Sequence, residues 1–167
     1  YNLHLYEELC RAGESLDLKH CGYRSIESLR LEKSYRALYR DLDLEHTALE
    51  AGLDRFIKWD KDTFWGKDAL VQQRENGLTT KLVTLQVETV DADAWMNESV
   101  YRDGRLVGRV TSGATSHSVG HCISMAYVEA EVAQPGNTVE VQVLERRIPA
   151  TIIKDSPYDP ENKRPRT

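Results

Sequence analysis

The spacing of hydrophobic residues changes near the middle of the chain. Up to residue 77, apolar side chains recur every three or four positions, which is typical of amphipathic helices. From residue 81 they alternate with polar side chains, which is typical of strands that bury one face. The sequence therefore predicts an α+β protein. We place a domain boundary near residues 77–80, which separates residues 1–78 from residues 79–167.

The first part of the chain predicts three helices, at residues 1–13, 23–36 and 66–75. Gly13 suits the C-terminal cap of the first helix, and Asn76-Gly77 ends the third. Two charged pairs on the second helix have the spacing of ion pairs on one helix face, namely Glu27–Arg30 and Glu32–Arg36. We also expect short strands at residues 16–18 and 56–59, and an irregular acidic segment at residues 41–52.

The second part predicts five or six short strands. Val83, Leu85 and Val87 share one face of the first strand. Asp103-Gly104 separates two strand-like runs and is the strongest hairpin signal in the chain. Pro149 lies in the last alternating series and suggests an edge strand, because proline cannot donate to a ladder. Strands of this length and spacing predict a small antiparallel barrel or sandwich.

Three further segments carry expectations about their surroundings. Residues 90–98 are expected to form a loop anchored by Trp95. Residues 157–167, rich in proline and charge, are expected to lie loosely on the surface. The chain starts at Tyr1 inside a helical pattern, so we expect it to be a fragment of a longer protein.

Composition narrows the range of partners. The chain has 167 residues, a formal net charge of −5 and a pI near 5.6, which argues against a nucleic-acid partner because such binders present a basic face. No apolar run reaches the roughly 20 residues that span a bilayer, so we expect no membrane partner. Three cysteines without Cys-x-x-Cys spacing favour a reducing compartment. We expect a soluble protein of the cytoplasm, or of the mitochondrial matrix if it is eukaryotic.

No pattern of residues assigns catalysis or metal binding to this chain. It has no Gly-x-Gly-x-x-Gly fingerprint and no phosphate-binding loop. His117, His121 and Cys122 form a metal-like cluster, but they lie in a loop without an adjacent carboxylate, so we predict no metal site. The hydroxyl residues around His117 lack a nucleophile elbow, so we predict no catalytic residue.

One acidic run leaves two interpretations open. It contains Asp41, Asp43 and Glu45, followed by His46. Such a run is either a carboxylate pair for acid–base chemistry or, more often, a solvated loop.

Four stretches together resemble a known family. They are residues 28–35 (SLRLEKSY), 104–113 (GRLVGRVTSG), 118–128 (SVGHCISMAYV) and 155–164 (DSPYDPENKR). In this order they resemble the C-terminal half of the glycine-cleavage T-protein, or aminomethyltransferase, family. The last stretch narrows the resemblance to the T-like module of dimethylglycine and sarcosine dehydrogenases. The implied fold is the helical end of a folate-binding lobe followed by a C-terminal antiparallel β-barrel.

The resemblance also implies cofactor-binding residues. The family's folate-facing arginine on this helix falls on Ile26, so that contact is absent, and Arg24, two positions earlier, is the implied substitute. A second folate-facing position falls on Tyr35, whose phenol offers a stacking face and a polar tip. Arg40 stands where the family usually has glycine. The family's catalytic aspartate and its pterin-binding glutamate are expected upstream of this chain.

The function implied by the resemblance is tetrahydrofolate-dependent transfer of a one-carbon unit. The family's chemistry is attack by a tetrahydrofolate nitrogen on a methylene-iminium species, which FAD in a missing upstream domain would generate from an N-methylated glycine. The implied partners are therefore the folate, this amine and the upstream domains, and the isolated fragment is expected to be inactive. Two alternatives stay open, a non-catalytic regulatory homologue and a folate-dependent demethylase of the superfamily. A nucleic-acid-binding barrel is disfavoured by the acidic charge.

Overall fold

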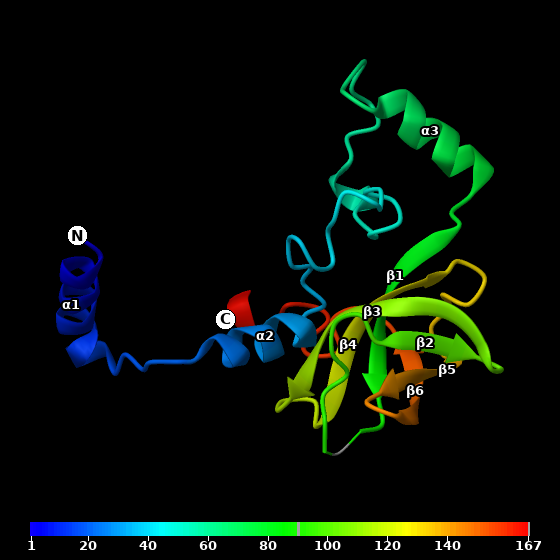
Figure 1. Cartoon of the computed structure of the whole chain (residues 1–167). Coiled ribbons are helices and arrows are strands. Elements are labelled where there is room, and N and C mark those ends of the chain that lie inside the picture. The colour runs from blue at the N-terminus through cyan, green and yellow to red at the C-terminus, as the bar shows by residue number, and fades with distance from the viewer. Residues whose placement is uncertain (90, 167) are drawn as a thin grey trace.

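A computed structural model of the chain describes residues 1–89 and 91–166. The helices are α1 (Asn2–Gly13), α2 (Tyr23–Glu32) and α3 (Lys67–Asn76), with short 3₁₀ helices η1 (Glu14–Leu16), η2 (Asp54–Phe56) and η3 (Arg164–Arg166). The strands are β1 (Thr80–Val87), β2 (Ser99–Arg102), β3 (Arg105–Ser116), β4 (His121–Glu129), β5 (Thr138–Val143) and β6 (Arg146–Ile153). Helices precede a strand-rich body (Figure 1), which confirms the predicted α+β class.

The six strands form a closed antiparallel barrel in the order β1-β4-β3-β2-β5-β6, and β6 pairs again with β1. The predicted hairpin joins β2 to β3, and Asp103 and Gly104 both have the positive φ that a tight hairpin turn requires. The edge strand suggested by Pro149 is wrong, because β6 has a neighbour on each side. Pro149 still takes part through its carbonyl, which accepts a hydrogen bond from the Glu88 amide at 2.9 Å.

Two hydrophobic clusters stabilise the barrel and its contact with α2. The barrel interior is filled by one face of each strand, including Val83, Leu85 and Val87, which share a face as predicted. The second cluster covers the outer face of β1 and β4 and includes Leu31 of α2 packed with Leu82, Ile123, Met125 and Tyr127. Because β4 is buried on both faces, its sequence is almost continuously apolar.

Helix α2 ends earlier than the sequence predicts. Ser34 has a φ of 51°, and the Tyr35 amide donates to the Arg30 carbonyl at 2.9 Å. A left-handed residue followed by this backward bond is a common C-terminal cap, and it turns the chain away from the helix axis. The predicted Glu32–Arg36 ion pair is therefore wrong, since Arg36 lies beyond the turn and pairs with Asp155 at 2.7 Å.

The two expected short strands of the first part are also wrong. The chain forms the 3₁₀ helix η1 before residues 17–18, and Asp17 has a left-handed φ of 56°. In the second segment, η2 ends with the Ile57 amide bonded to the Asp54 carbonyl. Residues 41–52 are irregular, as predicted.

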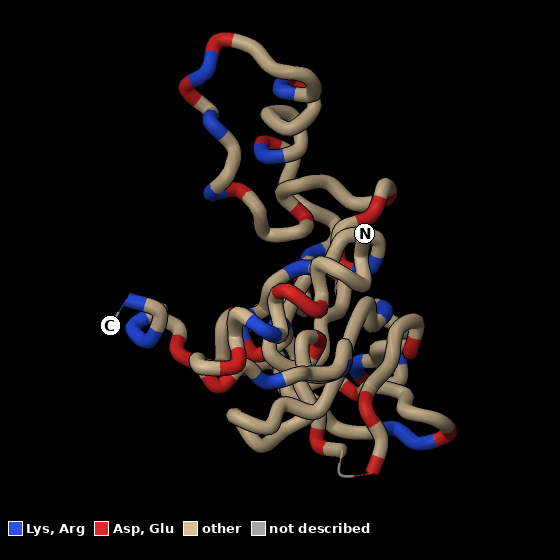
Figure 2. The backbone as a smooth tube through the Cα atoms, turned by 90° about the vertical axis from the view of Figure 1, so that its left-hand side faces the viewer, with Lys and Arg blue, Asp and Glu red and all other residues tan. Residues whose placement is uncertain are grey.

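Helices α1 and α3 stand away from the barrel (Figure 1). The apolar face of α1 is exposed, including Leu5 and Leu9, and α3 has no buried residue. Acidic and basic residues are interspersed along the arm that carries α3 (Figure 2). Among the described residues, no helix combines the length and the apolar character needed to cross a membrane.

The C-terminal tail is held more firmly than predicted. Ser156 donates from its amide to the Ser34 hydroxyl and from its own hydroxyl to the Lys33 carbonyl, each at 2.9 Å. The Tyr158 amide donates to the Glu32 carbonyl at 3.0 Å. The start of the tail is therefore bonded to the end of α2, while residues 160, 161 and 163–166 are exposed on the surface, as predicted.

Candidate functional site

A pocket of about 570 Å³ lies between α2 and the barrel, a size typical of small-molecule sites. Helix α2 contributes Tyr23, Arg24 and Leu29 to its walls. The barrel contributes Trp95 from the β1–β2 loop and His117 from the β3–β4 turn. The pocket therefore combines aromatic and apolar surface with cationic or basic side chains from two separate parts of the chain.

The acidic side chains of the pocket already have partners. Glu27 accepts from Arg30 at 2.7 Å and from Arg40 at 2.8 Å, so the predicted Glu27–Arg30 pair is confirmed. Burial acts to raise the pKa of Glu27, but the hydrogen bond and charge of Arg30, with Tyr23 and Arg40, outweigh it and lower this pKa. Glu27 is therefore held as a carboxylate that is already neutralised.

Glu32 fixes the turn that carries His117. Its side chain is buried, and it accepts from the Ser116 hydroxyl at 2.8 Å and from the Ser118 amide at 3.0 Å. Ser28, one turn earlier on α2, donates to the Thr115 carbonyl at 2.8 Å. These bonds join one face of α2 to the end of β3 and set the width of the pocket.

Unlike these acids, Arg24 and His117 have no hydrogen-bond partner among the described residues. Within the described part of the chain, Arg24 makes no hydrogen bond or ion pair, and its guanidinium carbon lies 5.6 Å from the centroid of the Trp95 ring. His117 is exposed and likewise has no hydrogen-bond partner among the described residues. Asp93 lines the same pocket and accepts from the Thr115 hydroxyl at 2.6 Å. Arg24 and His117 are thus the basic groups of the pocket that no described residue engages in a hydrogen bond, and a cation of this kind suits an anionic ligand.

The structure does not bring Arg24 and Tyr35 into one site. Arg24 lies in the first turn of α2, whereas Tyr35 follows its last turn and is not among the residues that line this pocket. The Tyr35 side chain is exposed, and its carbonyl accepts from Arg30 at 3.1 Å. Ile26, at the family's arginine position, is also exposed.

Asp41 is the centre of a buried polar network, so the solvated-loop interpretation is wrong for this residue. Its side chain is 0% exposed and accepts from Arg30 at 2.8 Å, from Ser112 at 2.6 Å and from the Thr111 hydroxyl. A bulge in β3 between Val110 and Ser112 aims both hydroxyls at the same oxygen. With its oxygens occupied in this way, Asp41 is a structural carboxylate and not a free base.

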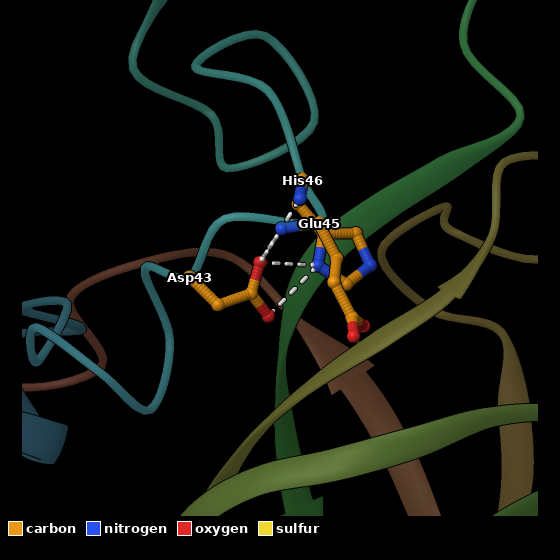
Figure 3. A group of neighbouring side chains, drawn as sticks. All are labelled: Asp43, Glu45 and His46. Atoms are coloured by element: carbon orange, nitrogen blue, oxygen red, sulfur yellow. Dashed lines mark hydrogen bonds and ion pairs between the residues drawn. The ribbon is translucent and has the colours of Figure 1, made fainter.

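Asp43, Glu45 and His46 form a small group beside this network, and their potential ligand atoms lie within 4.8 Å of one another. Figure 3 shows the Asp43 carboxylate against the imidazole, with oxygen–nitrogen distances of 2.9 and 3.0 Å. The ring stacks on Tyr127 with centroids 3.5 Å apart. Because one ring nitrogen is already bonded to Asp43 and Glu45 is exposed, the group serves to fix the loop.

The other candidates are not assembled into a site in the described part of the chain. His121 is exposed while Cys122 points into the barrel core, so they do not form a ligand group with His117. Ser112 and Ser116 donate to buried carboxylates, and neither is bonded to His117. The interpretation of these hydroxyls as a nucleophile–base pair is therefore not supported by the geometry.

Trp95 and Gly113 are site residues that sequence reasoning missed. Trp95 was expected to anchor its loop, but its side chain is 49% exposed, and among the described residues of that loop it is Ala94 that is buried. A Cβ atom on Gly113 would lie 1.9 Å from the Ala94 carbonyl oxygen. A glycine inside a strand often marks such a close approach of backbone, and this signal could have located the contact.

The fold is a small closed antiparallel barrel with a pocket between its outer face and helix α2. The profile of the GCVT N-terminal domain matches residues 1–61, and that of the glycine cleavage T-protein C-terminal barrel domain matches residues 80–159. These matches confirm the resemblance seen in the motifs, and the chain belongs to the glycine-cleavage T-protein family.

Similar proteins of two kinds support this placement. Mitochondrial dimethylglycine dehydrogenase of Rattus norvegicus is 41% identical over 152 residues, which cover 90% of this chain and 18% of that protein. A probable aminomethyltransferase of Thermococcus kodakarensis is 36% identical over 171 residues, covering 95% of this chain and 42% of that protein. This chain therefore spans well under half the length of these relatives.

A solved structure agrees on the fold. The glycine cleavage system aminomethyltransferase T from Bartonella henselae superposes with a TM-score of 0.72 at 23% sequence identity. The match covers 80% of this chain and 38% of that one.

Proposed function

We propose that this chain is a tetrahydrofolate-binding module for one-carbon transfer, of the kind present in dimethylglycine and sarcosine dehydrogenases. The observation that carries the proposal is the pocket between α2 and the barrel, with an unpaired Arg24 in its wall. It occurs in a chain whose two parts match both T-protein domains in order.

The residues present fit a folate. Folates carry flat aromatic rings and carboxylates, and the pocket offers the aromatic walls of Tyr23 and Trp95, the apolar Leu29 and the cationic Arg24. When bound, tetrahydrofolate supplies the nitrogen that accepts the one-carbon unit. The chain's own residues bind and orient the cofactor and keep the neighbouring acids neutralised.

The described acids that line the pocket all accept hydrogen bonds, and Asp93 does so from the Thr115 hydroxyl at 2.6 Å. Glu27 is paired with two arginines, and Glu32 accepts from the β3–β4 turn. We therefore propose that the catalytic aspartate and the FAD site belong to upstream domains of the same polypeptide. The proposed substrate is an N-methylated glycine, as the name of the dehydrogenase relatives indicates for those proteins. Mitochondrial relatives support a matrix location if the source is eukaryotic.

Two finer assignments stay predictions. Tyr35 is proposed to contact the folate from outside the described pocket, where another domain would complete the site. The division into residues 1–78 and 79–167 is proposed as the boundary between the folate-binding lobe and the barrel.

The main alternative is a regulatory homologue that binds folate but does not turn over an amine substrate. Ile26, which stands at the family's arginine position, favours this alternative. A folate-dependent demethylase acting on another methyl donor is the second alternative. The three functions differ in the methyl donor consumed, so product analysis separates them.

The test uses the intact polypeptide that contains this chain. We expect sarcosine or dimethylglycine to be oxidised and methylenetetrahydrofolate to form only when tetrahydrofolate is present. Arg24→Ala should weaken folate binding roughly tenfold, because a charge-assisted contact is lost. The matched control is Arg55→Ala, since Arg55 lies on η2 outside this pocket.

The results separate the alternatives. Folate binding without turnover of either amine would favour the regulatory homologue, and turnover of a different methyl donor would favour the demethylase. No folate binding by the parent protein would overturn the proposed function.

A further inference from the structure

The β1–β2 loop exposes a tryptophan while burying its small neighbour. Ala94 is 0% exposed and belongs to the barrel core, whereas Trp95 is 49% exposed and lines the pocket. Burial of a tryptophan would remove far more apolar surface from water than burial of an alanine. The loop therefore does not use its largest apolar side chain for folding.

The backbone of this loop is nevertheless tightly fixed. Its contact with the bare backbone of Gly113 leaves no room for a side chain there. The Glu98 carboxylate accepts from the Trp95 amide at 2.8 Å, and the Asn97 amide donates to the Val110 carbonyl at 2.8 Å. On the other side, Thr115 donates to Asp93 at 2.6 Å. Trp95 is thus presented by a rigid support, which is the arrangement expected of a preorganised binding residue.

The surroundings of the indole point to an aromatic ligand. Arg24 lies over the ring, and Leu29 lines the same pocket from α2. We propose that Trp95 is a folate-binding residue that stacks against one of the planar rings of the cofactor. This inference rests on the proposed function, and it adds Trp95 of the barrel to the aromatic surface that Tyr23 provides from α2. Tryptophan offers a large flat surface at low cost in conformational entropy, which suits this role.

The experiment measures binding of 5-formyltetrahydrofolate to the intact polypeptide by calorimetry. The variants are Trp95→Ala and Trp95→Phe, with Trp65→Ala as control because Trp65 is fully exposed and does not line this pocket. We expect Kd to rise about tenfold for W95A and about threefold for W95F, since Phe keeps a smaller stacking face. W65A should bind like the parent protein.

Fluorescence gives a second readout that a purely structural role would not move. Binding should change the emission of the parent and of W65F, and this ligand-dependent change should be much smaller in W95F. W95F also keeps the test decisive should W95A fail to fold.

The outcomes separate the two claims. Equal affinities in the parent, W95A and W95F, with folate bound, would overturn the stacking role and leave the proposed function standing. Absence of folate binding by the parent would overturn the proposed function and the role of Trp95 with it.

Discussion

The barrel and the N-terminal helices of this chain use their hydrophobic residues in opposite ways. In the barrel, Leu85 is 0% exposed and belongs to a core closed on all sides by six strands. In α1, Leu9 is 57% exposed although it lies on an amphipathic face with Leu5. The barrel buries its apolar residues in a closed core, whereas the described residues leave the apolar face of α1 exposed.

Helix α2 shows what a covered helix needs. It has Leu31 in a hydrophobic cluster with the outer barrel face, and its polar residues Ser28, Arg30 and Glu32 all bond to other segments. Neither α1 nor α3 has a described residue in the two hydrophobic clusters. Helix α3 contacts its neighbouring segment through polar groups, since Gln73 accepts from the Thr47 hydroxyl at 2.7 Å and Arg74 lies over the Trp59 ring. The pocket lies between α2 and the barrel, so the contacts of α2 with the barrel hold its walls in place.

The largest expected effect comes from the buried ion pair that joins α2 to the barrel. Asp41→Ala leaves Arg30 without one of its two carboxylates and the Ser112 hydroxyl without its acceptor, while Thr111 keeps only its 3.2 Å contact with the Met125 carbonyl. Removing one partner of a buried pair costs about 3–5 kcal/mol. Urea unfolding should show this loss as a lower midpoint with an unchanged slope.

The matched control is Glu131→Ala, which breaks an exposed pair with Arg105. An exposed pair contributes at most about 1 kcal/mol. Equal losses in the two variants would mean that Asp41 is far more accessible to water than the structure indicates.

The next largest effect is the difference in stability loss between a barrel-core leucine and a leucine of α1. Leu85→Ala should cost about 2–5 kcal/mol, because it opens a cavity in the closed core. Leu9→Ala in residues 1–167 should change the free energy of unfolding by less than about 0.5 kcal/mol, since that side chain is already in water.

Leu85→Ala and Leu9→Ala can also be compared in a longer polypeptide that contains this chain. If further domains cover α1, Leu9→Ala becomes costly there while the cost of Leu85→Ala stays the same. A large cost of Leu9→Ala in residues 1–167 alone would contradict the exposed position of α1.

Local patterns predicted the barrel strands well, and distant contacts explain most of the errors. The alternation around Leu85 and the turn at Gly104 are local signals, and the structure has both. Closure by β6 onto β1 was not predictable, because Pro149 suggests an edge when only its own strand is considered. Strand pairing across this distance leaves no trace in residue spacing.

The candidate site was less predictable than the fold. Asp41 looks like part of a solvated acidic run, and its hydroxyl partners are 70 and 71 residues away. Arg24 was found through the family resemblance and lies in the pocket wall. The large side chain of Trp95 predicts an anchor for its loop, but Trp95 is 49% exposed and the small Ala94 beside it is buried.

The smallest effects concern the pH dependence of stability, and they have opposite signs for Glu27 in the pocket wall and for Glu98, which accepts from the Trp95 amide. Arginine contacts lower the pKa of Glu27 in spite of its burial, so its stabilising contribution is present above the usual carboxyl value of 4.5. That contribution is lost as the pH falls through the lower folded value. Burial raises the pKa of Glu98, so its contribution is present below 4.5 and is lost as the pH rises through the raised folded value.

Glutamine substitutions separate these two cases, because glutamine resembles a protonated glutamate at every pH. Glu27→Gln should destabilise the chain at pH 7, and this loss should shrink as the pH is lowered to 3, below the usual carboxyl value of 4.5. Glu98→Gln should be as stable as the parent, or more stable, at pH 7, since its amide oxygen can still accept from the Trp95 amide. Urea midpoints at the two pH values measure both differences. A loss in Glu27→Gln that persists at pH 3 would show that the side chain acts through packing, and the ion pairs that join α2 to the Arg40 segment would then contribute little to the wall of the pocket.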